Sequence, residues 1–163
     1  MKLRLAIAEV RDAELELGRS LSALGERHKA DHDVFHVAAS LQALGRANLQ
    51  RLQPLAQRYD TELDPPDAPG ERAGGSLHKA REKASEMLGR RPEPGLVLLR
   101  DLRELHLLYA EASINWVILG QGAQAARDAE LLTVVSECHA QTLRGLKWTV
   151  TRLKEAAPQV LTS

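Results

Sequence analysis

The hydrophobic positions in the first 27 residues recur at intervals of three and four. The apolar series is Leu3, Ile7, Val10, Leu17, Leu21 and Leu24. This spacing places the series on one face of a helix. Glu14 occupies the step that the apolar series skips. The pattern therefore predicts a helix over about residues 2–27 that carries a carboxyl group on its buried face.

A second segment, residues 31–59, repeats the helical pattern. Asp31 is a good N-cap, and Asn48 stands in the same stripe as the leucines. Pro54 is expected either to kink this helix or to restart it.

The last two predicted helices cover residues 96–119 and 123–157. The first of them is apolar around more of its circumference than one bundle core needs. "GQG" at residues 120–122 reads as the turn between them, and Pro158 as the end of the last helix. His139 takes a stripe position in the last helix.

Residues 60–95 begin with "DTELDPPDAPGERAGG", which cannot hold regular structure and reads as a surface connection. Ser76 can cap a short extra helix before "PEPG" breaks the chain again. The predicted fold is all-α, an antiparallel four-helix bundle in one domain. A helix of about 25 residues is about 40 Å long, so the connection can cross the bundle and make the third helix parallel to the second. Simple up-down-up-down topology stays open.

Charge and cysteine content limit the partners and the cellular location that we expect for the protein. Lys and Arg total 22, as do Asp and Glu, so no charge excess favours nucleic acid or an acidic membrane surface. The single Cys138 cannot form an internal disulfide, and no apolar run approaches a bilayer span. We expect a cytoplasmic protein with neither a nucleic-acid nor a membrane partner.

Several polar residues are expected near the middle of the bundle. A turn near residues 29–30 sets Glu14 level with Gly45 and Asn48, and a turn at residues 121–122 sets His106 level with Cys138 and His139. A buried carboxylate in an apolar stripe needs a histidine, an amide or a metal ion as its partner. The alternative to a metal or ligand site is a purely structural layer of hydrogen-bonded polar side chains that sets the helix register.

Two segments carry a resemblance to a known family. "RDAELELGRSLSALG" resembles the start of the first helix, and "DAELLTVVSECHAQTLRGL" the last helix, of short bacterial ferritin-like proteins of uncharacterised function related to the YciE/YciF group. In metal-binding members of the ferritin-like superfamily, the first and third helices each supply a glutamate, and the second and fourth each supply Glu-x-x-His. The resemblance implies a ferritin-like bundle and a place for two metal ions in its core.

The chain departs from that ligand pattern. The second helix has no acidic residue between Val34 and Tyr59, and Glu137 and His139 are spaced i, i+2, which points them to different faces. The metal ligands that the resemblance implies are degenerate: Glu14, His106, Glu111 and His139, with Glu104 as the alternative to Glu111. The cofactor stays open between none and a divalent metal such as iron, manganese or zinc.

Three other features each have two readings. His32 and His36 within one helix can chelate a surface ion, or simply form a solvated helix start. Cys138 is expected to be a small buried residue rather than a nucleophile. Trp116 and Trp148 are expected to anchor the core or a subunit contact rather than to line a cofactor site.

These observations favour a non-catalytic structural or interaction module that lacks a complete di-iron site and forms a homo-oligomer. The rival hypothesis is a metal-binding ferritin-like protein, oxidase-like or for storage, with a non-standard site in the bundle core. A third is a sensor that binds a small molecule between the helices.

Overall fold

The computed structural model describes residues 2–61, 63 and 93–163. These contain four α-helices and no strand: α1 (Leu3–Arg27), α2 (His32–Gln57), α4 (Pro94–Ala125) and α5 (Ala129–Thr162). The all-α prediction is confirmed for the described part of the chain. The short extra helix expected between residues 76 and 91 lies outside the described residues.

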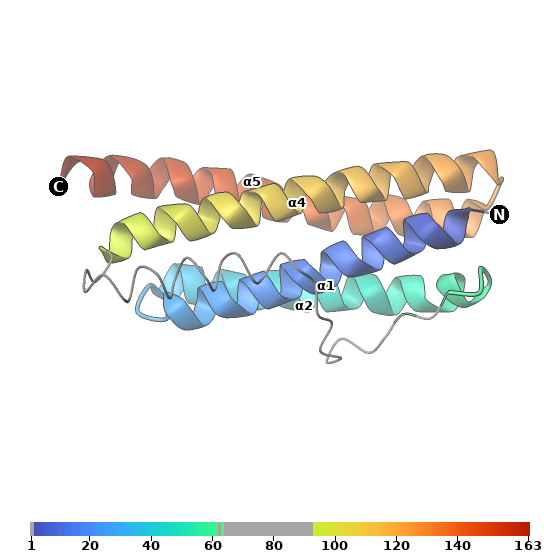
Figure 1. The fold of residues 1–163 in the computed structure, drawn as a ribbon, viewed down its shortest axis with the longest axis horizontal. Coiled ribbons are helices and arrows are strands. Elements are labelled where there is room, and N and C mark those ends of the chain that lie inside the picture. The colour runs from blue at the N-terminus through green and yellow to red at the C-terminus, as the bar shows by residue number, and fades with distance from the viewer. Residues whose placement is uncertain (1, 62, 64–92) are drawn as a thin grey trace.

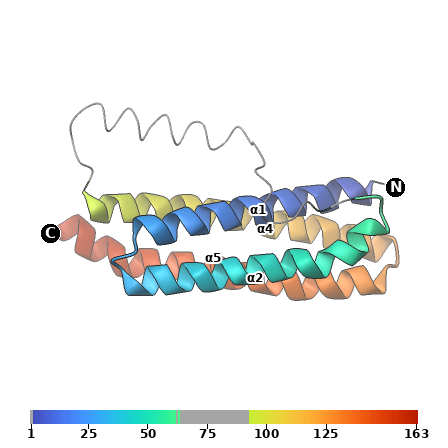
Figure 2. The same cartoon turned by 90° about the horizontal axis from the view of Figure 1, so that it is seen from below.

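The helices lie side by side in a bundle of four (Figure 1). The neighbouring pairs are α1 with α2, α4 with α5, α1 with α4, and α2 with α5, so α1 lies diagonally from α5 and α2 from α4. Each neighbouring pair is antiparallel, whereas α2 and α4 run in the same direction (Figures 1 and 2). The end of α2 and the start of α4 are therefore at opposite ends of the bundle.

Acidic residues cap the second helix of each hairpin. Asp31 accepts a hydrogen bond from the backbone N–H of Val34 at 3.1 Å, and Asp128 accepts one from that of Leu131 at 3.0 Å. These bonds satisfy backbone donors that the first turn of a helix leaves without a partner. Just before Asp128, Arg127 has a φ of 56°, in the left-handed region, which reverses the chain between α4 and α5.

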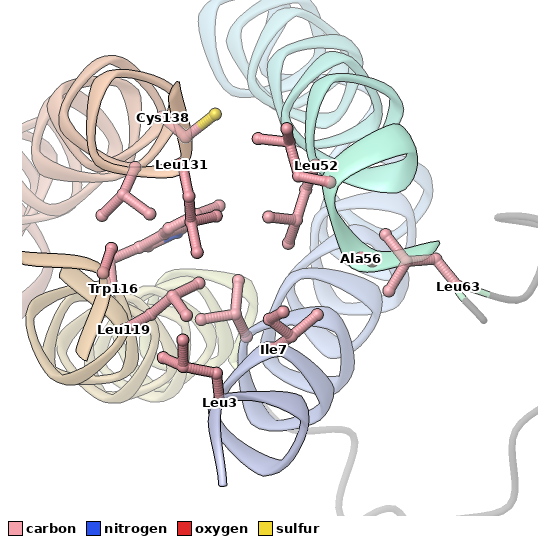
Figure 3. Close-up of a cluster of buried hydrophobic side chains, with 13 residues drawn as sticks. Leu3, Ile7, Leu52, Ala56, Leu63, Trp116, Leu119, Leu131 and Cys138 are labelled. Atoms are coloured by element: carbon pink, nitrogen blue, oxygen red, sulfur yellow. The ribbon is translucent and has the colours of Figure 1, made fainter. Parts of the chain in front are cut away.

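The core divides into two clusters along the bundle. The first lies at the end that holds the start of α1, and its side chains point toward one another from all four helices (Figure 3). The second fills the other end around Leu21, Leu41 and Leu102. Glu14, Asn48 and Thr142 are buried on the helices that both clusters share. Trp116 belongs to the first cluster with no exposed surface, and Trp148 packs partly buried against the second, so both serve the core.

The turn predicted at residues 120–122 is wrong, because α4 continues through "GQG" to Ala125. Both glycines lie where helices pack closely. A β-carbon on Gly120 would lie 3.2 Å from Val135, and one on Gly122 would lie 2.5 Å from Leu3. The glycines therefore permit close helix contact rather than a reversal of the chain.

Pro54, expected to kink or restart its helix, lies inside α2, and Pro158, wrongly expected to end its helix, lies inside α5. α2 runs without a restart past Pro54 to Gln57, and α5 continues past Pro158 to Thr162. Each proline is exposed and within the last turns of its helix, so water can bind the carbonyl group that loses its helical partner. In the described part of the chain, no helix is long and apolar enough to cross a membrane.

Candidate functional site

The carboxyl group of Glu14 lies at the centre of the bundle. Its position in the apolar stripe of α1 turns it inward, and only 4% of the residue is exposed. The sequence-based expectation that this residue is buried and needs a partner is met. The partners come from all three other helices.

Three side chains donate hydrogen bonds to Glu14, and all three reach the same oxygen, Oε1. Asn48 Nδ2 of α2 donates at 3.2 Å, Trp116 Nε1 of α4 at 2.8 Å and Thr142 Oγ1 of α5 at 3.3 Å. One atom of α1 is thus joined to each of the other helices. Among the partners expected from the sequence, the amide of Asn48 is the one that the structure supplies.

Burial raises the pKa of the Glu14 carboxyl above its usual value, and the three hydrogen bonds from Trp116, Asn48 and Thr142 oppose this shift without cancelling it. The same environment acts on two neighbours. Burial and the charge of Glu14 raise the pKa of Tyr109. The pKa of the Cys138 thiol is raised to about 11: burial is the main cause and the charge of Glu14 adds to it, while Arg51 opposes it. Cys138 is fully buried with a suppressed thiolate, which agrees with a structural role.

A cleft of about 500 Å³ opens beside Glu14 between α1 and α2 and reaches α4 and α5 at its base. Its walls include Gly18 of α1 and Gly45 of α2. A β-carbon on Gly18 would have no atom within 4 Å, whereas one on Gly45 would lie 3.1 Å from Oε2 of Glu14. The absence of side chains at these two positions leaves this space open, and Oε2 is the oxygen of Glu14 on the Gly45 side.

Tyr109 forms part of the base of this cleft. Its ring lies directly over Gly145 of α5, where a β-carbon would be 2.2 Å from Cζ. Any larger residue at position 145 would displace the ring. Gly145 therefore sets how closely α4 and α5 approach at the level of the cleft.

The two histidines expected beside Glu14 have other partners. His106 Nδ1 lies 2.9 Å from Thr149 Oγ1, and His139 Nε2 lies 2.8 Å from Ser113 Oγ. Neither ring is among the hydrogen-bond partners of Glu14. The expected register of α4 against α5 was wrong because the chain reverses at Arg127 and not at "GQG", which sets His106 level with Thr149 rather than with His139.

Unlike Glu14, the acidic residues Glu111 and Glu137 are exposed. Glu111 lies on the outer side of α4, and Glu137 forms an ion pair with Arg51 on α2. Glu104, the alternative to Glu111, is half-buried. The adjacent residues Glu137, Cys138 and His139 therefore face solvent, the core and α4 respectively, and form no common site.

The structure does not assemble the metal ligands that the resemblance implies. Glu14, His106, Glu111 and His139 do not form a cluster, and the described residues contain no group of three or more His, Cys, Asp or Glu side chains able to hold a metal ion. At the start of α2, His32 and His36 stack with their ring centroids 6.3 Å apart, both exposed. A surface ion on that pair stays a prediction.

A second buried acidic residue was missed in the sequence. Asp101 of α4 is 7% exposed and accepts from Arg27 at 2.8 Å, while His28 Nε2 lies 2.8 Å from the same Oδ2. Burial raises the pKa of Asp101, but the bonds from His28 and Arg27 outweigh it and hold the pKa below its usual value. The helical spacing indicates its burial, since Asp101 lies on the same face of the helix as Leu98 and Leu105.

Comparison of the chain with protein-family models, with curated proteins and with solved structures gives no match in any of the three. The interpretation of the site therefore depends on its own geometry.

Proposed function

We propose that this chain is a bacterial, cytoplasmic, ferritin-like bundle that lacks a working di-iron centre and serves as a non-catalytic structural or interaction module. The observation that supports the proposal is the environment of Glu14. In metal-binding members of the ferritin-like superfamily, which the chain resembles, the first helix gives a carboxylate to a metal ion. Here Oε1 accepts three hydrogen bonds from neutral donors.

The chemistry of those donors argues against a cation at Oε1. Asn48, Trp116 and Thr142 all present hydrogen atoms toward the oxygen. A metal ion bound at Oε1 would need neighbouring atoms that offer lone pairs. The indole N–H of Trp116 has none to offer. α2 contributes no carboxylate from Val34 to its end, so the second helix lacks its share of a di-iron ligand set. The shared direction of α2 and α4 agrees with a ferritin-like chain path.

Elemental analysis of protein purified without chelators tests this proposal. We expect no stoichiometric iron, manganese or zinc in the bundle interior. Stoichiometric metal that is lost in both Glu14→Ala and His139→Ala would overturn the proposal in favour of the metal-binding alternative. Metal that is lost only in His32→Ala would belong to the surface pair and leave the proposal standing.

The interaction surface that we propose is the outer side of α4, and its occupant is a second copy of the chain. Leu107, Ile114, Val117 and Ile118 are between 44% and 59% exposed there. Leu107, Ile114 and Ile118 follow each other at intervals of seven and four, the spacing with which helices pair along a seam. Residues exposed in this pattern on one helix are typical of a subunit contact.

Light scattering at micromolar concentration tests the contact. We expect a mass above that of the monomer for the wild type and the monomer mass for Ile114→Glu. Phe35→Glu is the matched control, because Phe35 is 37% exposed on α2, diagonally across the bundle. A monomeric wild type, or equal effects of the two variants, would contradict the proposed contact.

A further inference from the structure

Glu14 has one carboxyl oxygen that the bundle does not use. Oε1 accepts all three hydrogen bonds, from Asn48, Trp116 and Thr142, and within the described residues Oε2 accepts none. Oε2 is not among the buried side-chain atoms without a partner in the described residues, so it keeps some contact with solvent although the residue as a whole is only 4% exposed. The unused oxygen is on the side of Gly45, where the cleft begins. This is an acceptor set deep in the protein and directed at open space.

The cleft has the size and lining of a small-molecule site. Its volume of about 500 Å³ is within the range of about 300–1,000 Å³ that is common for such sites. Leu41, Leu44 and Leu49 of α2 line it with apolar surface. One deep polar group below apolar walls is the arrangement that orients a ligand with a polar head and a hydrocarbon body.

The charge of Glu14 determines which polar group of a ligand the cleft favours. The acids among the described residues that line the cleft are Glu14 and Glu26, and of these two Glu14 is the buried one. Asn48 and Thr142 already direct their donors to its other oxygen. A cationic N–H donor would satisfy Oε2 and form a charge-assisted hydrogen bond. A carboxylate or phosphate head would meet a like charge. A metal ion would find a single oxygen of one carboxylate, too few ligands for a divalent cation.

The entrance of the cleft does not oppose a cation. Arg19 is paired with Glu16 at 2.7 Å. The remaining charged lining residues are Arg46 and Glu26, one of each sign. The charges at the entrance therefore balance, and the buried carboxyl at the base decides the preference.

We propose that this cleft binds a small organic ammonium ion, whose N–H donates to Glu14 Oε2 and whose hydrocarbon part packs against Leu41, Leu44 and Leu49. The bundle is thus a receptor for an amphiphilic amine, a role beyond that of a structural module. Glu14 holds the bundle together with one oxygen and binds the ligand with the other.

The indole N–H of Trp116 reports on the site because it donates to the same carboxyl group. Trp148 is the only other tryptophan, and it serves as an internal reference in the ¹⁵N-labelled protein. Hexylamine is the probe, with hexan-1-ol and hexanoate as matched compounds of equal chain length. We expect saturable shifts of the Trp116 signal with hexylamine, and binding about tenfold or more tighter than hexan-1-ol, the difference for a hydrogen bond to a charged group. Equal binding of amine and alcohol, or no shift of Trp116, would overturn the proposal.

Two glycine variants test the location without removing the carboxyl group. Gly18→Leu fills the cleft from a position where a β-carbon has no neighbour within 4 Å, and Gly45→Ala places a methyl group against Oε2. We expect both variants to unfold cooperatively and to bind hexylamine about tenfold more weakly or worse, since each blocks the charge-assisted bond. Unchanged affinity in Gly18→Leu would exclude the cleft.

Glu14→Gln tests the chemistry. Its carbonyl oxygen can still accept from Trp116, Asn48 and Thr142, while an NH₂ group replaces Oε2 at the cleft. We expect the preference for hexylamine over hexan-1-ol to disappear. An unchanged preference would overturn the proposal, as would shifts of Trp116 produced by zinc or manganese chloride but not by hexylamine.

Discussion

The indole Nε1 of Trp116 donates a hydrogen bond of 2.8 Å to Oε1 of Glu14 at the centre of the bundle. Both residues are almost fully enclosed, and they come from α4 and α1, which belong to different hairpins. The bond ties the two hairpins together where water cannot compete. Its contribution to stability is therefore measurable in single variants.

Trp116→Phe is expected to lower the free energy of unfolding by about 2–4 kcal/mol. The change deletes part of a fully buried side chain and removes a donor from a buried carboxyl group. Urea unfolding followed by circular dichroism measures the loss. Trp148→Phe is the control, because Trp148 is only partly buried at the edge of the second cluster, and its loss should be smaller. Equal losses would show that the hydrogen bond contributes nothing beyond packing.

The raised pKa of Glu14 predicts a pH dependence of stability. In the unfolded chain the carboxyl group titrates near its usual value of 4.5, and in the folded bundle it titrates higher. The folded state therefore holds the proton more tightly, and its stability falls as the pH rises from 4.5 through the folded pKa. Glu14→Gln does not titrate and should lack this component.

The measurement is the difference in unfolding free energy between wild type and Glu14→Gln from pH 4.5 to pH 8. We expect the wild type to lose stability relative to the variant as the pH rises, and the difference to level off above the folded pKa. Parallel curves across this range would show that Glu14 titrates alike in the folded and unfolded states.

For Asp101 we expect the opposite pH dependence of stability from that of Glu14. The pKa of Asp101 is held below the usual 3.8 in the folded protein, where it contacts Arg27 and His28, so its contribution is present above pH 3.8 and lost as the pH falls through the folded pKa. Asp101→Asn should cost about 1.5–3 kcal/mol at pH 7, the range for hydrogen bonds to charged groups, and less in acid. Glu16→Gln breaks an exposed pair and should cost less than about 1 kcal/mol. Equal costs at pH 7 would contradict the buried role of Asp101.

Two glycines of the bundle should respond to alanine in opposite directions. Gly145→Ala drives a methyl group into the Tyr109 ring and should destabilise by about 1–3 kcal/mol. Gly18→Ala meets no atom and should stabilise by about 0.5–1 kcal/mol, because alanine favours the helix. Thermal unfolding of both variants and the wild type measures the two changes in stability. A stable Gly145→Ala variant would mean that the ring moves aside without cost.

The α1–α2 half of the site was predictable from the sequence. The short turn after His28 leaves little freedom in how these helices pair, and the sequence sets Glu14 level with Gly45 and Asn48. The structure has the hydrogen bond from Asn48 and places Oε2 3.1 Å from where a β-carbon of Gly45 would be. The α4–α5 half was not. Gly120 and Gly122 have the composition of a turn, but they are helical because Val135 and Leu3, distant in the chain, pack against them.

The sequence by itself determined that four apolar stripes fold as helices and that Glu14 is turned inward, because helical periodicity is a local property that adjacent residues decide together. Only the tertiary structure decided which groups of α4 and α5 meet that carboxyl. Partners across a bundle depend on the register of one helix against another, and moving the reversal of the chain to Arg127 replaced two expected histidines with Trp116 and Thr142. The same packing left Oε2 facing the cleft, since the missing side chains of Gly18 and Gly45 create a space only once α1 and α2 lie together.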